Sequence, residues 1–389
     1  MVRFLSTLII LLSISLGVFG QNDTNDLKIS ILTCADGAQM YSSFGHSAVR
    51  VVSPSRGIDH VYNYGMFNYN QKLFYVKFVR GFLNYHVSGC RFQRFCLEYV
   101  RDGREIREQV LNLDSQQRQQ VFDFLEWNCL EENRYYRYNF LEDNCATRIR
   151  DIVQNTCGSD VSLADIQYTE SFRDMIHAHL SDMPWFRFGV DLLMGLPVDR
   201  KANSSTAMFL PENVFATLEQ STITHNGHSE PLVLESNVLL KADPVNKKDI
   251  FTYLSPSLLF WLLFAVLGVV TYYEVKREKH HVWIDRVLLF VVGLFGLLFV
   301  FMWIGTEHTV TAGNLNILWA IPTHIAAAFG VKNINQLWQK YFTVTAVLTL
   351  AVLVLSPLIP QQFDVGNYPI MCILILRLAY LAKFKKKNN

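Results

Sequence analysis

The residues of this chain best suited to chemistry are cysteines and histidines in the first 250 positions. Cys145 follows Asp143 and Asn144, two residue types that cap helices well, so the spacing predicts that Cys145 lies in the first turn of a helix. There the helix dipole and the free backbone N–H groups favour the thiolate, which is the nucleophilic form of cysteine. Cys129, beside Trp127, lacks this setting, and we interpret it as a core residue.

A thiol nucleophile needs a base, and His46 is one candidate for this role. It opens a predicted strand after Gly45, where the chain can pass close to a helix N-terminus packed on the sheet. Composition does not choose between His46 and the other histidines of this part of the chain, which are His60, His86, His177 and His179.

Composition excludes several classes of protein. The 389 residues carry 35 Lys and Arg against 34 Asp and Glu, and the first 250 show no basic cluster with interleaved aromatic residues, so nucleic-acid binding is not predicted. No two of the seven cysteines form a CxxC pair, so the sequence implies no zinc site, and it implies no organic cofactor. Cys90 with Cys96, or Cys34 with Cys157, could form a disulfide, and the pairing stays open.

Signals outside this region predict export and a membrane anchor. Residues 1–20 combine a basic Arg3, an apolar stretch and a small residue at the end, as in a secretory signal peptide, and we expect cleavage there. Lys and Arg residues follow the first, third and fifth of the apolar segments after position 250 and are missing from the other two connections. The positive-inside rule therefore predicts a cytoplasmic C-terminus. These segments are residues 254–271, 282–304, 315–329, 342–359 and 368–381.

The membrane half carries polar residues that need a reason. The third segment is the weakest candidate for a span of about 20 residues, and a re-entrant hairpin is the alternative there. His308, Asn314 and Asn316 at its outer end are interpreted either as interfacial and interhelical hydrogen-bonding groups or as part of a substrate groove at the outer leaflet. Arg377 is expected to extend to the cytoplasmic interface.

The predicted organisation is a signal peptide in residues 1–20, an extracytoplasmic domain in residues 21–250 and a transmembrane domain in residues 251–389. The exported domain mixes predicted strands and helices and is therefore α+β, and the transmembrane domain is an all-α bundle of about five helices. Asn226 and Gly227 predict a hairpin turn. Strands or extended segments are expected over residues 27–34, 46–52, 60–64, 85–96 and 105–113, and helices over residues 69–79, 115–131 and 145–153.

Two short motifs carry a resemblance to known enzymes. Residues 44–50 (FGHSAVR) and 143–147 (DNCAT) resemble the His box and the Asn-Cys box of circularly permuted papain-like enzymes, which include lecithin:retinol acyltransferase-like proteins and permuted relatives of NlpC/P60 peptidases. In that group the His precedes the Cys, and the Cys begins a helix packed against the strand that carries the His. Over nearly the whole mature chain, the sequence is similar to the Lnb lipoprotein N-acyltransferase family of Bacteroidota. This similarity rests on residues 62–67, 191–200, 209–211 and 314–319 and on the apolar tail.

The resemblance implies transfer of a fatty acyl chain from a phospholipid to the α-amino group of a lipoprotein's lipidated N-terminal cysteine. Cys145 would form an acyl-thioester, with His46 as general base and acid. Asn63 on the adjacent strand is expected to orient His46. Asp59 and His60 are the alternatives, because a one-residue slip of strand register would exchange these side chains.

The same resemblance implies the surroundings of the reaction. Asn144 and Tyr64, with Tyr41, are expected to line the substrate site, although the tyrosines also fit a core or a rim. The expected partners are a phospholipid donor and diacylglyceryl-modified lipoproteins, both anchored in the outer leaflet of the bacterial inner membrane. A cell-wall peptidase or amidase with the same Cys and His, which would use water as the acceptor, is the alternative enzyme. A non-enzymatic membrane scaffold is the alternative of another class.

Overall fold

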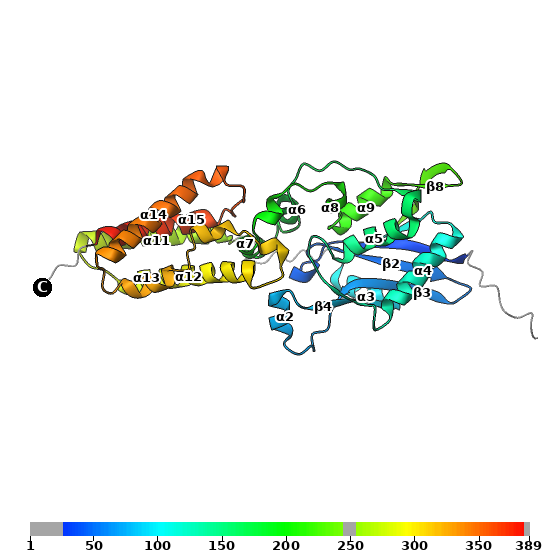
Figure 1. Ribbon diagram of the computed structural model, residues 1–389, viewed down its shortest axis with the longest axis horizontal. Helices are drawn as coiled ribbons and strands as arrows, with labels where there is room; N and C mark the ends of the chain where they lie inside the picture. Colours follow the sequence, from blue (N-terminus) through cyan, green and yellow to red (C-terminus); the bar gives the residue numbers. More distant parts are fainter. Residues whose placement is uncertain (1–25, 244–253, 385–389) are drawn as a thin grey trace, which may run out of the picture.

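The computed structural model describes residues 26–243 and 254–384, which form a β-sheet domain and a helical bundle placed end to end (Figure 1). The predicted signal peptide lies outside the described residues, as does the expected boundary at residue 250.

The first domain is built on a seven-stranded antiparallel sheet with the order β10-β5-β1-β2-β3-β4-β6. Cys34 at the end of β1 is paired with His46 at the start of β2 and with Ile106 at the start of β5. Leu240, at the end of the last strand before the bundle, is also paired with Ile106. One end of the sheet therefore faces the bundle, and we call it the membrane-proximal end. The strands are β1 (Lys28–Cys34), β2 (His46–Ser53), β3 (Ile58–Met66), β4 (Asn84–Arg91), β5 (Ile106–Leu111), β6 (Tyr135–Arg137) and β10 (Val233–Leu240).

Helices cover both faces of this sheet, because alternate residues of each central strand point to opposite sides. Val49 and Val51 of β2 share a buried cluster with residues of α4 (Ser115–Cys129), α5 (Cys145–Cys157) and α9 (Pro211–Glu219). Ala48 instead belongs to the cluster of α3 (Phe92–Asp102) on the other face. The helix that begins at Cys145 thus packs across the strand that begins at His46 (Figure 1).

Several local predictions are confirmed, and others need correction. β8 (Thr222–His225) and β9 (His228–Pro231) form the expected hairpin, with positive φ at both turn residues. The segment 85–96 was expected to be extended throughout, but the chain becomes helical after Arg91. The reason is that Phe95 and Tyr99, one helical turn apart, both bury against the sheet. The helix expected over residues 69–79 begins later, as α2 (Phe74–Arg80).

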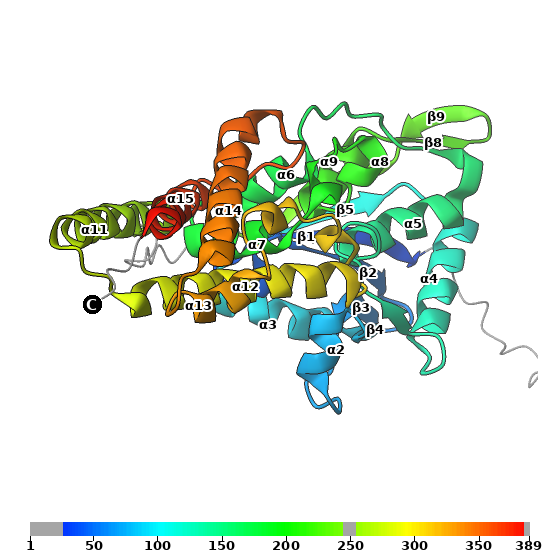
Figure 2. The ribbon, with the colours of Figure 1, turned by 60° about the vertical axis from the view of Figure 1, so that its left-hand side comes forward.

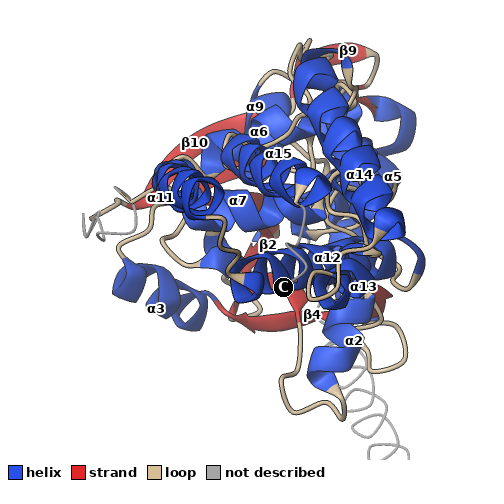
Figure 3. Ribbon diagram, turned by 90° about the vertical axis from the view of Figure 1, so that its left-hand side faces the viewer, coloured by secondary structure: helices blue, strands red, loops and turns tan. Residues whose placement is uncertain are grey.

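Three helices of the described residues are long and apolar enough to cross a membrane, namely Pro256–Arg277, Val282–Ile304 and Gln336–Leu358. They contain α11 (Pro256–Arg277), α12 (Val282–Ile304) and α14 (Gln336–Leu355). The fifth predicted segment forms α15 (Asn367–Lys383), whose 17 residues pack mainly against α14 and α11 (Figure 3). The structure thus supports a helical bundle, and three of its described helices have the length and hydropathy of a membrane span. The count of about five membrane helices stays a prediction.

The third predicted segment is not a continuous helix. It consists of the 3-10 turn η6 (Leu315–Leu318) and the seven-residue helix α13 (His324–Gly330), with irregular backbone between them. Trp319, Ala320 and His324 are all buried. Irregular backbone is tolerated at membrane depth where protein surrounds it, so this burial explains how the chain can dispense with a helix here.

Arg377 corrects another expectation. Its side chain is 1% exposed and makes bidentate hydrogen bonds to Asp285, at 2.7 Å each, and a 2.6 Å bond to Glu274. The guanidinium therefore does not extend to an interface. It joins α15 to α11 and α12 at the end of the bundle away from the sheet, because two buried carboxylates there need a cation.

Candidate active site

Cys145 occupies the first position of α5, and the cap before it is firmly held. Asn144 is the N-cap, and its Oδ1 accepts hydrogen bonds from the N–H groups of Ala146, at 2.8 Å, and Thr147, at 3.0 Å. Its Nδ2 donates to the carbonyl oxygens of Phe140, at 2.7 Å, and Phe209, at 2.9 Å. Every hydrogen-bonding position of this amide is thus used within the protein. Asn144 thus fixes where the Cys145 helix starts, and its expected role in substrate binding stays a prediction.

His46 and Asn63 complete a chain of hydrogen bonds that begins at the thiol. The His46 ring is hydrogen-bonded to Cys145. Its Nε2 lies 2.5 Å from Oδ1 of Asn63. Because a carbonyl oxygen can only accept, Nε2 carries a proton and Nδ1 is left for the thiol. Three segments far apart in sequence, namely the start of β2, the end of β3 and the start of α5, meet at this point.

The electrostatics of the pair favour charge separation. Burial raises the pKa of the Cys145 thiol, but the charge of His46, its hydrogen bond and the backbone N–H groups of Ser47 and Ala146 outweigh burial and hold that pKa below its ordinary value. Burial lowers the pKa of His46, but the charge of Cys145 and the hydrogen bonds of the ring to Cys145 and Asn63 leave that pKa above its ordinary value. A thiolate beside an imidazolium is the reactive form of a cysteine nucleophile.

The other candidates for the orienting residue are engaged elsewhere. Asp59 receives two hydrogen bonds from Arg50, at 2.8 and 3.0 Å. His60 is paired with Val51 in the body of the sheet, away from its membrane-proximal end. Asn63, three residues further along β3, lies just before an irregularity in the β3–β4 pairing. Strand register thus brings Asn63, rather than Asp59 or His60, to His46.

The competing histidines also have partners of their own. Nε2 of His177 lies 2.8 Å from a carboxylate oxygen of Asp191. Nδ1 of His179 lies 2.5 Å from Asp36, and its ring lies against Phe44. Both rings belong to the region that packs against the bundle.

The two tyrosines have different surroundings. Tyr64 is 1% exposed and donates a 2.7 Å hydrogen bond to Oδ1 of Asn128, so its hydroxyl is a core group. Tyr41 lies on the 3-10 turn η2 (Met40–Ser42), close to His46 in sequence, and is 61% exposed. Tyr41 retains a surface on which a substrate could pack. The ring of Tyr64 lines a surface depression beside α5.

The polar residues of the membrane half connect the two parts of the molecule. Asn314 is buried and donates a 2.7 Å hydrogen bond to the carbonyl of Leu192, at the end of α7 (Pro184–Leu193). Asn316 is also buried and accepts from Trp319 Nε1 at 3.0 Å. These contacts match the hydrogen-bonding interpretation of Asn314 and Asn316. His308 lies nearer the surface and bonds the carbonyl of Phe78 at 3.1 Å.

The cysteines are free throughout the described residues, which include all seven. Cys34 and Cys157 belong to clusters on opposite faces of the sheet, so the pairing considered for them is excluded. Burial raises the pKa of Cys34 to about 12, so that thiol is unreactive although it lies beside the site. Within the described residues no cluster of His, Cys, Asp or Glu could hold a metal ion.

Two features of the site were missed from sequence. The N–H of Ser47 bonds the thiol, and a backbone donor leaves no mark in residue types. Arg104 is buried and donates a 2.8 Å hydrogen bond to the carbonyl of Ala35, which holds the loop before His46. Arg104 stands among other charged residues, with Arg101 before it and Arg107 after it, so its residue type gave no signal that it is buried.

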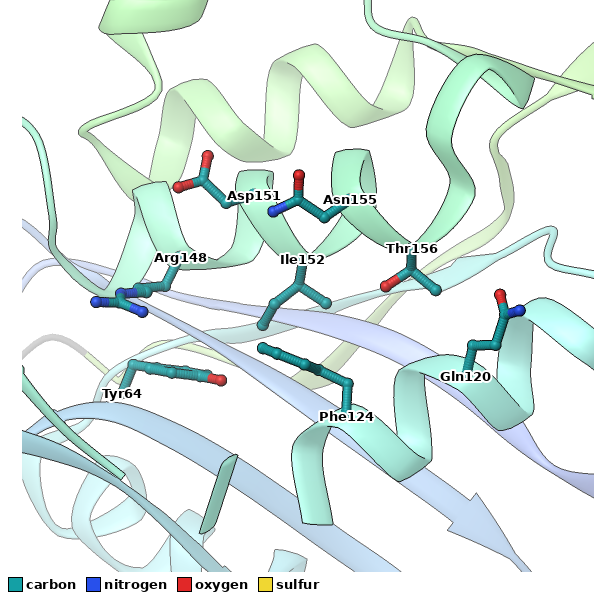
Figure 4. A pocket seen from close by; sticks show the side chains of 8 residues that line it. All are labelled: Tyr64, Gln120, Phe124, Arg148, Asp151, Ile152, Asn155 and Thr156. Carbon is teal, nitrogen blue, oxygen red and sulfur yellow. The ribbon is translucent and has the colours of Figure 1, made fainter. Parts of the chain in front are cut away.

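A surface depression of about 500 Å³ lies beside α5 but does not contain the thiol. Arg148, Asp151, Ile152 and Asn155 of α5 line it together with Phe124 of α4 (Figure 4). Its lining includes neither Cys145 nor His46, so this depression is separate from the candidate catalytic residues.

The fold and the site define a class of protein: an antiparallel α+β domain with a Cys–His–Asn arrangement, held against a helical membrane bundle. Residues 18–179 match the family model of the Lnb N-terminal periplasmic domain, and residues 246–389 match that of the Lnb transmembrane domain. The chain therefore belongs to the Lnb family, with its sheet domain in the periplasm, and the family indicates an acyltransferase of lipoprotein N-acylation. No curated protein and no solved structure matched the chain.

Proposed function

We propose that this protein transfers a fatty acyl chain from a phospholipid to the α-amino group of a lipoprotein's diacylglyceryl-modified N-terminal cysteine. The observation that carries the proposal is the hydrogen-bonded Cys145–His46–Asn63 chain at the membrane-proximal end of the sheet. His46 precedes Cys145 in the sequence, as in permuted papain-like enzymes, and we propose that fold for the periplasmic domain.

In the proposed first half-reaction, His46 takes the thiol proton and the thiolate attacks the ester carbonyl of the phospholipid. The cap bonds the N–H groups of Ala146 and Thr147, so the N–H of Cys145 itself is the helix-terminal donor left for the oxyanion. The carbon–oxygen bond then breaks, and His46 returns the proton to the departing alkoxide. The products are the Cys145 acyl-thioester and a lysophospholipid.

In the second half-reaction the neutral α-amine of the lipoprotein attacks the thioester. His46 takes a proton from the attacking nitrogen, the carbon–sulfur bond breaks, and the proton passes to the Cys145 thiolate. The acyl chain ends in an amide and the enzyme returns to its starting state. Asn63 holds His46 in orientation through both steps and exchanges no proton.

Both substrates of this reaction are anchored in the membrane, so the active site must be held at the membrane surface, and the bundle can do this. The membrane-proximal end of the sheet carries His46 and leads through Leu240 toward the bundle. We propose that this end meets the outer leaflet of the inner membrane, that the signal peptide is cleaved, and that the C-terminus is cytoplasmic.

Mass spectrometry of a lipoprotein's N-terminal peptide tests the proposal, in cells whose lipoprotein N-acylation depends on this protein. We expect Cys145→Ala to abolish the N-linked acyl chain while the diacylglyceryl group remains. Cys129→Ala is the matched control, because burial raises the pKa of that thiol to about 11 and it lies outside the site. Unchanged triacylated peptide in the Cys145→Ala strain would refute the proposal, and altered cell-wall peptides there would favour the peptidase alternative.

A further inference from the structure

The segment of residues 66–82, which contains α2, exposes an unusual amount of apolar surface, and we call it the α2 hook. Exposed large apolar patches mark sites of interaction with proteins or membranes. Tyr75 is 80% exposed, and the hook contains six further exposed apolar or aromatic side chains. These are Met66, Tyr69, Leu73, Val76, Phe78 and Val79.

The hook lies beside the end of α12 that faces the sheet domain (Figures 1 and 2). The N–H of Glu307, three residues after α12 ends, donates a 2.9 Å hydrogen bond to the carbonyl of Arg80. Nε2 of His308 lies 3.1 Å from the carbonyl of Phe78. α12 is long and apolar enough to cross a membrane, so its end marks the level of the bilayer surface. The hook is therefore held at that level.

The hook is also rigid enough to hold its side chains in place. Phe67 packs against Tyr69, Phe74 and Tyr85, with ring centroids 4.7 to 5.9 Å apart. A second fixed point is Gly81, whose missing side chain lets the backbone of Glu307 approach closely. The exposed apolar side chains are thus presented outward by a packed support.

The charge of the hook fits a lipid surface. Lys72, Lys77 and Arg80 are basic, and residues 66–82 contain no acidic residue. Aromatic side chains among basic ones are typical of segments that lie in the headgroup region of a membrane with anionic lipids.

We propose that the α2 hook inserts into the outer leaflet beside the bundle, with its apolar side chains among the upper acyl chains and its basic groups on anionic headgroups. This gives the periplasmic domain a second membrane contact, separate from the bundle. The inference rests on the position of α12 and does not require the proposed acyl transfer.

A photo-crosslinking amino acid at position 75 tests this contact in the full-length protein, in nanodiscs of phosphatidylethanolamine and phosphatidylglycerol. The control position is Leu234, which is 60% exposed at the opposite end of the sheet. We expect phospholipid adducts with the crosslinker at position 75 and no phospholipid adducts with the crosslinker at position 234. Absence of lipid adducts at position 75, or adducts there with a second protein chain, would overturn the proposal.

Two further variants sharpen this test. The first distinguishes failure of this proposal from failure of the proposed function, and the second tests the role of headgroup charge. In the Cys145→Ala background the adducts at position 75 should persist, because lipid contact by the hook needs no chemistry. Replacing Lys72, Lys77 and Arg80 by Gln should lower the share of phosphatidylglycerol among the adducts. An unchanged share would overturn the role given to headgroup charge.

Discussion

The thiol and the imidazole of this site each change the other's protonation. Burial raises the pKa of the Cys145 thiol, and without His46 the largest effect that lowers this pKa would be lost. Cys34, whose pKa burial raises to about 12, shows how strongly burial alone can act beside this site. With His46 beside it, the pKa of Cys145 lies below its ordinary value. The reactivity of this one cysteine therefore belongs to the pair rather than to the residue.

Alkylation of Cys145 by iodoacetamide should expose this dependence. The lowered pKa makes the thiolate available at pH values at which an ordinary thiol, with a pKa near 9.0, is still protonated. In His46→Ala the lowering charge is gone and burial dominates, so the alkylation profile should shift to higher pH. Quantitative mass spectrometry of the labelled peptide across a pH series measures the shift.

Cys34 in the same sample is the internal control and should stay unlabelled at every pH of the series. Identical profiles for the wild type and His46→Ala would contradict the pairing of thiol and imidazole.

The nucleophile and its base were easier to predict from the sequence than the residues that hold them in position. Cys145 and His46 stood in short motifs whose residue types carry the chemistry. Asn63 depended on strand register, which residue types do not specify. Asn144 was expected to meet substrate, because an exposed polar residue beside a nucleophile looks the same in sequence as a buried cap. Its partners, the carbonyl groups of Phe140 and Phe209, are backbone atoms of remote segments.

At the scale of elements, the packing of the third predicted segment, which contains η6 and α13, depends on glycine residues of α12. A Cβ atom at Gly296 of α12 would lie 2.1 Å from the carbonyl oxygen of Ala320. A Cβ at Gly293 would lie 2.6 Å from the N of Ile325. Backbone thus packs directly on backbone, which lets the irregular segment between η6 and α13 stay buried.

Gly296→Ala should therefore destabilise the bundle by about 1–3 kcal/mol, the usual cost of overpacking. Thermal unfolding of the full-length protein in detergent measures the effect. Gly268→Ala on α11 is the matched control, because nothing lies within 4 Å of a Cβ atom there, and its melting temperature should not fall. Equal melting temperatures for the two variants would show that the bundle tolerates a larger distance between α12 and the third predicted segment.

The elements that the sequence revealed least well are those shaped by remote contacts. β1, β2 and α5 follow clear local patterns, and the structure has them where they were expected. α3 was not found from the sequence, because aromatic residues suit a strand and its helical period becomes visible only once Phe95 and Tyr99 are seen against the sheet. The apolar third segment likewise resembled a helix, because hydropathy records burial and not backbone conformation.

At the scale of the molecule, the periplasmic domain and the bundle meet through backbone as well as side chains. A Cβ atom at Gly195 would lie 2.0 Å from the carbonyl oxygen of Ala312, and the Gly195 N–H donates a 2.9 Å hydrogen bond to Val310. Gln362 adds a 3.0 Å bond from its N–H to Asp199. The interface thus fixes the distance between the site and the membrane, which a linker alone would not do.

Gly195→Ala should push the two parts away from each other. We expect a lower melting temperature and a large loss of lipoprotein N-acylation, while the Cys145 thiol keeps its wild-type alkylation profile. Gly189→Ala in α7 has open space around its Cβ position and should behave like the wild type in all three assays. Full acylation by Gly195→Ala would show that the spacing does not matter for transfer.

The ionic cluster at the far end of the bundle has a consequence for how the chain is made. Glu274 lies 103 residues and Asp285 lies 92 residues before Arg377, whose guanidinium neutralises them both, so both carboxylates leave the ribosome well before it. Until α15 is inserted, the nascent bundle carries two carboxylates without their cation, and such charges are costly in a membrane. We therefore expect a chain truncated before Arg377 to retain this defect and to be degraded by membrane proteases faster than the full-length chain.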